Sequence, residues 1–417
     1  MEQQAKKIWI FDSTLRDGAQ GEEISFSVQD KLNIVQTLDQ LGIDYIEAGN
    51  PGSNPKDLEF FERVGQLTLH HAKLVAFGST RRKEEKVEDD INLQALLSAN
   101  TKAVSIFGKS WDFHVTDIIH TTLEENLRMI EETVAFLKAH GKEVIFDAEH
   151  FFDGYKRNPD YAIQTLLAAQ KGGADYICLC ETNGGAFPDE VSRIVAQVLP
   201  QLRVPVGIHT HDDGGMAVAS SVMAVLAGAQ MVQGTLIGFG ERCGNANLSA
   251  IIANLQLKRN YQCIPPENLH KLMQTCRVVS EISNVRLHKN MPYVGKSAFA
   301  HKGGMHIDGV NKAPASFEHI NPESVGNSRR FLMSEVAGRS TLIERIQKVD
   351  ASVRREDEVT TRIINQVKEM EHQGYQFEGA DATLEMLIRK QLGQYRPFFR
   401  VEKFKTIGEQ QAGGVDR

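Results

Sequence analysis

The chain has 417 residues, of which 41% are hydrophobic and 24% are charged, and its formal net charge is −7. This size predicts one large domain and at least one smaller one, and an acidic chain without a basic stripe is not expected to bind nucleic acid. No apolar run approaches the roughly 18 to 20 residues of a transmembrane helix, and the N-terminus MEQQAKK lacks the core of a signal peptide, so we expect a cytoplasmic protein without membrane contact.

Short apolar runs alternate eight times with helical patterns along the first part of the chain. The runs are IWIFDS from Ile8, YIEAG from Tyr45, KLVAFGS from Lys73, AVSIFG from Ala103, EVIFDAE from Glu143, YICLCET from Tyr176, VPVGIHTH from Val204 and MVQGTLIGFG from Met231. Eight such units in about 255 residues predict a (β/α)8 TIM barrel, although a doubly wound open sheet shows the same alternation. In one helical segment, Thr122 and Glu125 predict a capping box.

Polar side chains follow several of these runs, and their distribution favours the barrel. They are Asp12, Arg16 and Asp17 after the first run, Glu47 in the second, Asp147 and Glu149 in the fifth, Glu181 and Thr182 in the sixth, and His209 and His211 in the seventh. A barrel gathers the carboxyl ends of its strands around one mouth, whereas an open sheet spreads them along a row. The basic cluster from Arg81 to Lys83 is expected to be solvated.

The segment HTHDDGG, from His209 to Gly215, predicts a metal site. His209 and His211 project to the same side of a strand because side chains alternate along it. Two neutral imidazoles form half of a site for a divalent cation. The five cysteines are an odd number without a CxxC pair, so we expect free thiols.

Three motifs resemble one known family. They are DSTLRDGAQ from Asp12, HTHDDGG from His209 and GFGERCGNANL from Gly238, and FAHKGGMHIDGVNK from Phe299 extends the likeness past the barrel. Together they are similar to the Claisen-condensing acyltransferases that include 2-isopropylmalate, homocitrate and citramalate synthases, within the wider metallolyase barrels that include 3-hydroxy-3-methylglutaryl-CoA lyase. The resemblance covers roughly residues 5 to 395.

The resemblance implies a set of site residues. The metal ligands would be Asp17, His209, His211 and Asn245, which suit Mg²⁺, Mn²⁺, Co²⁺ or Zn²⁺. Arg16, Gln20 and Thr182 would bind substrate, although Thr182 could instead cap a helix. Arg16, Glu149 and His306 would be catalytic, with His301 as the competing histidine. Relatives commonly have a tyrosine where this chain has Phe317, which puts the role of that hydroxyl in doubt here.

Within the family, GNPGSNPKD from Gly49 and the segment from Ser316 look most like the citramalate synthases. These enzymes join pyruvate to acetyl-CoA in isoleucine biosynthesis, a branch of branched-chain amino-acid biosynthesis. The alternatives are a 2-isopropylmalate synthase or another 2-oxo acid condensing enzyme, a metal-dependent acyl-CoA lyase or aldolase, and an inactive binding protein.

The domain expectation follows from the same resemblance. Residues 1–275 would form the catalytic barrel, 276–393 a mainly helical linker subdomain, and 394–417 the truncated start of a regulatory domain with a flexible tail. The segment 264–283 predicts an amphipathic helix. The resemblance also implies a homodimer in which His306 acts in trans on the partner's site.

Overall fold

The computed structural model describes residues 5–53, 55–332, 339–377, 379–397, 399–406 and 408. The chain divides into two compact units. The first comprises Met1–Phe299 and His319–Arg329, and the second comprises Ala300–Glu318 and Arg330–Arg417.

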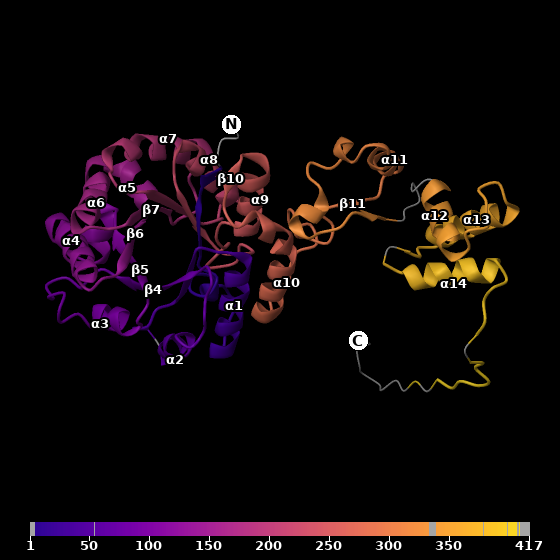
Figure 1. The fold of residues 1–417 in the computed structure, drawn as a ribbon, viewed down its shortest axis with the longest axis horizontal. Coiled ribbons are helices and arrows are strands. Elements are labelled where there is room, and N and C mark those ends of the chain that lie inside the picture. Colours follow the sequence, from indigo (N-terminus) through magenta and orange to yellow (C-terminus); the bar gives the residue numbers. More distant parts are fainter. Residues whose placement is uncertain are drawn as a thin grey trace. The chain divides into compact units, whose positions relative to one another are not determined.

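Eight parallel strands close into a barrel in the first unit, which confirms the predicted TIM barrel and makes the open-sheet alternative wrong (Figure 1). The strands are β2 (Trp9–Asp12), β3 (Tyr45–Gly49), β4 (Lys73–Ser79), β5 (Ala103–Lys109), β6 (Glu143–Glu149), β7 (Tyr176–Glu181), β8 (Val206–Thr210) and β9 (Met231–Gly234). Strand β2 pairs with both β3 and β9, and this last pairing closes the barrel.

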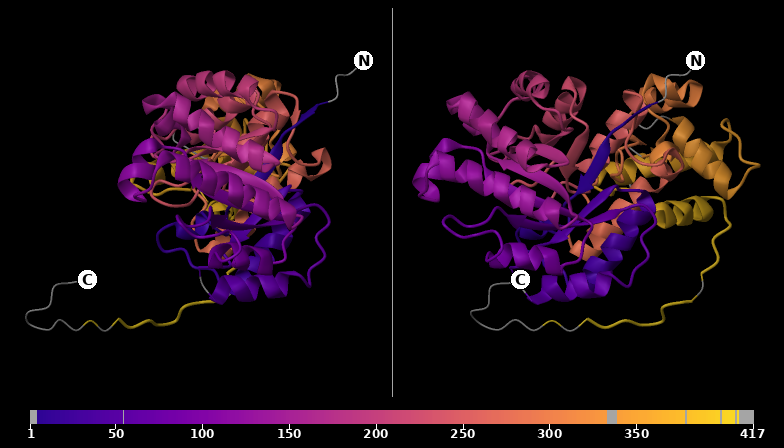
Figure 2. Two further views of the ribbon diagram at one scale, coloured as in Figure 1. Left: turned by 90° about the vertical axis from the view of Figure 1, so that its left-hand side faces the viewer. Right: turned by 60° about the vertical axis from the view of Figure 1, so that its left-hand side comes forward.

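Helices lie outside the strands, as the views from other directions also show (Figure 2). They are α1 (Val28–Leu41), α2 (Pro55–Val64), α3 (Ile91–Ser98), α4 (Leu123–Ala139), α5 (Phe151–Arg157), α6 (Pro159–Gly172), α7 (Pro188–Val198), α8 (Ala217–Ala227), α9 (Leu248–Lys258) and α10 (Leu272–Ser283). Local sequence sets their ends. Helix α1 begins with a capping box between Ser27 and Asp30, and it ends at Gly42 in the left-handed conformation. The predicted helix 264–283 starts as a 3-10 segment, Pro266–Lys271, before α10.

The start of α4 corrects two expectations. The Thr122 side chain accepts a hydrogen bond from the Glu125 amide, but the Glu125 carboxylate does not complete a capping box. Instead it accepts from Arg81 Nη1 at 2.8 Å, and Arg81 also pairs with Glu132. Arg81 is therefore buried rather than solvated, because two carboxylates replace its hydration.

The lower interior of the barrel is filled by large side chains. Phe11, Tyr45, Cys178 and Met231 belong to one buried cluster. The Tyr45 hydroxyl donates to Glu143 Oε1 at 2.6 Å. Because this end is packed, space for a ligand remains at the carboxyl ends of the strands.

The second unit has its own small core. Its elements are β11 (Ala300–His301), β12 (Arg330–Phe331), α11 (Gly304–Lys312), α12 (Arg339–Val349), α13 (Glu358–His372) and α14 (Asp381–Gln391). Ile346, Ile363, Val367, Leu384 and Ile388 pack together between the last three helices. This confirms a mainly helical subdomain after the barrel. Among the described residues, no helix is both long enough and apolar enough to cross a membrane.

Candidate functional site

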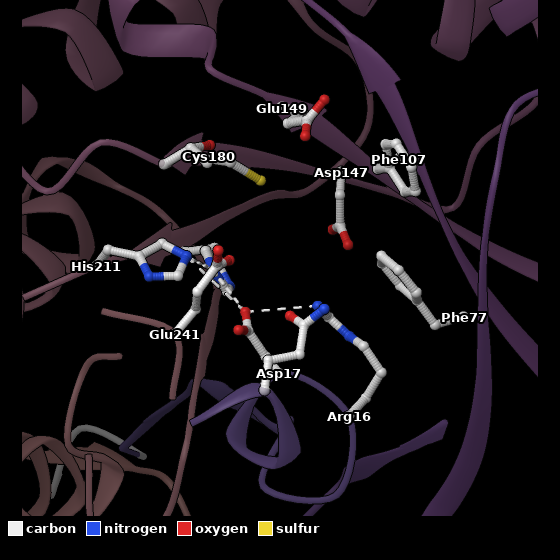
Figure 3. Close-up of a pocket in the computed structure, with 12 residues that line it drawn as sticks. Arg16, Asp17, Phe77, Phe107, Asp147, Glu149, Cys180, His211 and Glu241 are labelled. Atoms are coloured by element: carbon white, nitrogen blue, oxygen red, sulfur yellow. Dashed lines mark hydrogen bonds and ion pairs between the residues drawn. The ribbon is translucent and has the colours of Figure 1, made fainter. Parts of the chain in front are cut away.

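The carboxyl ends of the barrel strands surround a cavity of about 220 Å³ (Figure 3). Most of the predicted site residues line it, and these are Arg16, Asp17, Gln20, Glu149, Thr182, His209 and His211. They come from four different strand ends, so the closure of the barrel brings together residues that are up to about 195 positions apart.

The loop after β2 places Arg16 and Asp17 in this cavity. Arg16 Nε donates to Glu47 Oε2 at 2.6 Å, and its Nη1 lies 3.5 Å from Asp17 Oδ2. The guanidinium carbon is 3.8 Å from the centroid of the Phe77 ring. Three contacts therefore fix the guanidinium and leave its outer edge at the cavity.

The Asp17 carboxylate and the His211 imidazole lie near Arg16 in Figure 3, and His209 belongs to the same group. The Nε2 atoms of His209 and His211 are 3.2 Å apart, and Asp17 Oδ2 lies 3.4 Å from the first and 3.8 Å from the second. All three residues are buried. Asn245 is bridged to His211 through the backbone, and neither polar atom of its side chain has a hydrogen-bond partner among the described residues.

This donor set fits a divalent cation. Nitrogen and oxygen ligands of intermediate softness suit first-row divalent metals, and a buried amide without partners is costly unless something else satisfies it. A Cβ at Gly240 would lie 2.1 Å from Asn245 Nδ2, so a side chain at position 240 would displace this amide.

Burial and neighbouring charges set the protonation of these groups. Burial, with the adjacent His211, lowers the pKa of His209 to about 3, and burial also lowers the pKa of His211. Burial would raise the pKa of Asp17, but the adjacent Arg16 guanidinium opposes it, and the pKa of Asp17 lies below its usual range. The site therefore offers neutral imidazoles and a carboxylate, which are the forms that bind cations.

Glu149 and Thr182 also line the cavity, at the ends of β6 and β7. The Glu149 carboxylate forms a close ion pair with Lys109 Nζ. Thr182 Oγ1 accepts from the His150 amide at 2.9 Å. The alternative capping role of Thr182 is wrong, because α7 begins several residues later with Phe187 at its N-cap.

His306 and His301 both belong to the second unit, where they differ in surroundings. His306 is exposed on α11 and stacks on Phe317, with 4.2 Å between ring centroids. His301 is buried, and its Nε2 lies 3.0 Å from Glu318 Oε1. An engaged, buried imidazole is a poorer proton carrier than an exposed one, so His306 remains our candidate.

Several residues of the cavity wall were not predicted to belong to the site. They are Phe77, Phe107, Asp147, Cys180 and Glu241. The pattern of polar residues placed Asp147 at the mouth of the barrel without a role, and it gave no sign that the two phenylalanines line the site.

Asp147, Cys178 and Cys180 form a second buried group of side chains that could bind a metal. Burial raises the pKa of Cys178, and both Asp147 oxygens already accept hydrogen bonds from Ser105 and Gln233.

Two family models match the chain. The HMGL-like model matches residues 7–279, and the "Homocitrate synthase post-HMGL domain-like" model matches residues 293–375. An HMG-CoA lyase from Bacillus subtilis superposes with a TM-score of 0.57 at 20% identity, covering 69% of this chain and 98% of that one. At this identity the likeness supports the fold alone.

Closer relatives are found by sequence. The (R)-citramalate synthase of Aquifex aeolicus is 52% identical over 97% of this chain and 76% of its own length. That of Synechocystis sp. is 50% identical over 96% of this chain and 74% of its own length. A probable 2-isopropylmalate synthase of Methanopyrus kandleri is 34% identical over 88% of this chain and 70% of its own length. The chain therefore belongs to the (R)-citramalate synthase family of HMGL-like barrels.

Proposed function

We propose that this chain is an acyltransferase that condenses acetyl-CoA with pyruvate to give (R)-citramalate and CoA. The observation that carries the proposal is about 50% identity to (R)-citramalate synthases across nearly the whole chain. The 2-isopropylmalate synthase alternative rests on much lower identity. The product would serve branched-chain amino-acid biosynthesis.

The cavity wall supports a small 2-oxo acid. Phe77 and Phe107 stack with ring centroids 5.4 Å apart, and both line the cavity. We propose that these two rigid rings narrow the space beside the keto carbon and so disfavour an acid with a branched side chain. A steric wall of this kind discriminates by about 1–3 kcal/mol per methylene.

Asp17, His209, His211 and Asn245 would hold a divalent cation such as Mn²⁺, Mg²⁺, Co²⁺ or Zn²⁺. When bound, the cation would supply Lewis-acid polarisation of the keto oxygen. Thr182 and Gln20 line the same cavity, where they would hydrogen-bond the substrate and orient its keto carbon.

The residues divide the reaction between them. The Glu149 carboxylate, working with His306, removes a proton from the acetyl methyl group, and the resulting carbanion forms a C–C bond to the keto carbon. Arg16 donates hydrogen bonds to the keto oxygen as it becomes an alkoxide. Protonation of the alkoxide gives the tertiary alcohol, and water then breaks the thioester C–S bond to release CoA.

The quaternary and cellular setting follows the same family. We propose a homodimer in which the second unit of one protomer completes the site of the other, with the enzyme in the cytoplasm.

The deciding experiment measures CoA release from acetyl-CoA with pyruvate, 2-oxoisovalerate and 2-oxoglutarate, each with Mn²⁺ and with EDTA. We expect cation-dependent release that is fastest with pyruvate. Preference for 2-oxoisovalerate would transfer the assignment to 2-isopropylmalate synthesis. Cleavage of a 3-hydroxyacyl-CoA without consumption of acetyl-CoA would instead identify a lyase, and no release with any acid would overturn the proposal.

A further inference from the structure

We propose that Gln233 and Asp147 are positioning residues that hold His209 in the one tautomer that can bind a cation. The inference rests on the proposed function, because it concerns the proposed cation site. It assigns a role to two buried polar side chains that the proposed reaction leaves unused.

Four side chains from two pairs of neighbouring strands, β5 with β6 and β8 with β9, form a continuous hydrogen-bonded row across the barrel at the cavity. Ser105 Oγ on β5 donates to Asp147 Oδ2 on β6 at 2.6 Å. Gln233 Nε2 on β9 donates to Asp147 Oδ1 at 2.8 Å, and Gln233 Oε1 lies 3.2 Å from His209 Nδ1 on β8. The exposed fractions of these side chains are 5% or less, so water does not compete for the bonds.

The chemistry of each side chain determines which atom donates and which atom accepts in each hydrogen bond of the row. An ionised carboxylate only accepts hydrogen bonds, so the amide of Gln233 must turn its NH₂ group toward Asp147. Its oxygen then faces His209 and can only accept, which requires the hydrogen of the neutral imidazole to be on Nδ1. The lone pair of His209 is therefore on Nε2, the atom that faces His211 and Asp17.

Gln233 still accepts the hydrogen bond from His209 if Asp147 takes up a proton. The Ser105 hydroxyl can accept a hydrogen bond from the carboxyl group, and Oδ1 still accepts from Gln233. Loss of the Gln233 amide would instead leave the His209 ring free to place its hydrogen on either nitrogen. A side chain that hydrogen-bonds the second nitrogen of a metal-binding histidine typically raises metal affinity by about 10- to 100-fold.

The test is calorimetric titration of the metal-free full chain with Mn²⁺, which needs no turnover. We expect Gln233→Met, which has similar size but no amide, to bind Mn²⁺ about 10- to 100-fold more weakly than the native chain. Asp147→Ala should also weaken binding, because the Gln233 amide can then turn over. Asp147→Asn should restore it, since its side-chain oxygen can accept from Gln233 while its NH₂ group donates to Ser105.

Gln256→Met is the matched control, because it makes the same change at a half-buried glutamine outside the cavity, whose Oε1 accepts from the Cys263 and Ile264 amides. It should bind Mn²⁺ as the native chain does. Thermal unfolding in EDTA checks that every variant is folded. If Gln233→Met does not fold, the contrast between Asp147→Ala and Asp147→Asn decides.

The outcomes separate the two proposals. Native affinity in folded Gln233→Met, or equal affinity in the two Asp147 variants, would overturn the role of the row. A native chain that binds no Mn²⁺ would overturn the cation site itself and with it the proposed function.

Discussion

Arg16 is the residue on which the contacts of the cavity converge. Its Nε bonds Glu47, its Nη1 approaches Asp17 and its plane covers the Phe77 ring. Burial lowers the pKa of an arginine, but Glu47 and Asp17 raise that of Arg16 overall, so it keeps its charge. A planar fork satisfies these three geometries at once, whereas a lysine ammonium cannot.

Arg16→Lys should therefore keep the charge and lose the activity. We expect kcat for CoA release to fall about 100- to 1,000-fold, the usual cost of removing one donor to a developing oxyanion. Steady-state kinetics with pyruvate measures this, with exposed Arg82→Lys as the control. An Arg16→Lys enzyme with nearly native kcat would contradict the assignment.

Sequence reasoning predicted the site residues whose chemistry follows from a motif and missed those whose partners are distant in the chain. His209 and His211 were expected to share a side because two residues on one strand obey a fixed period. Gln233 and Asp147 are 86 positions apart, and their bond exists only because the barrel closes. Nothing in the strand MVQG distinguishes a glutamine that serves a histidine from one that faces solvent.

Helix ends, too, were predictable from the sequence only where they depend on residues close together in the chain. The Thr122 cap of α4 was predictable, because it depends on residues three apart. The behaviour of Glu125 was not, since Arg81 lies 44 positions away and offers a charged donor. An ion pair to arginine is stronger than a reciprocal bond to a backbone amide, so the long-range contact prevails.

Helix α5, which follows Glu149, packs closely against the segment at Ser110. A Cβ at Gly154 would lie 2.2 Å from the Ser110 carbonyl oxygen, whereas one at Gly185 would meet nothing within 4 Å. Gly154→Ala should lower the free energy of unfolding by about 1–3 kcal/mol through overpacking, while Gly185→Ala should be nearly neutral. Chemical denaturation of both variants measures the difference, and equal stability would refute the close packing.

Asp39 links α1 to the segment before β4 and predicts a pH dependence. Burial would raise its pKa, but the amides of His70, His71 and Ala72 donate to the carboxylate and lower that pKa overall. A lowered folded pKa stabilises the protein above the unfolded value, and this contribution disappears as the pH falls through the folded value.

Asp39→Asn should accordingly lose about 1–3 kcal/mol of unfolding free energy at neutral pH, because hydrogen bonds to a charged acceptor are weakened. The difference in unfolding free energy between the native chain and this variant should stay constant from about pH 7 to about pH 5, and it should shrink as the pH falls from there to about pH 3. Urea unfolding across this range measures the gap, with exposed Glu62→Gln as the control. A gap that does not change with pH would show that charge is not involved.

At the scale of the molecule, the barrel was predictable because eight repeats of one pattern reinforce each other, and an error in one element changes little. The division of the chain was harder to predict, since the first unit extends to Phe299 and takes in His319–Arg329 as well. No local sequence pattern marks the point at which the chain leaves one unit, or the point at which it returns to that unit.

The proposed homodimer, in which each site is completed in trans, predicts complementation between inactive chains. Glu149→Gln and His306→Asn should each be inactive alone. Co-expressed, they should recover about one quarter of native activity, because half of the random dimers are mixed and each mixed dimer has one intact site. Activity of the co-expressed mixture measures this, purified mixed dimers should recover about one half of native activity, and each variant purified alone is the control. No recovery in confirmed mixed dimers would place both residues in the same chain's site.

The packed lower interior of the barrel, with Phe11, Tyr45 and Met231, makes the cavity a dead end rather than a passage. In the proposed reaction, the 2-oxo acid bound beside Asp17 and the two histidines would lie at the closed end of the cavity, and a thioester arriving later would lie over it. Such a site requires an ordered reaction, in which the molecule that binds last is the first to leave. The small acid would have to enter first, and the thiol would have to leave before the new dicarboxylate behind it.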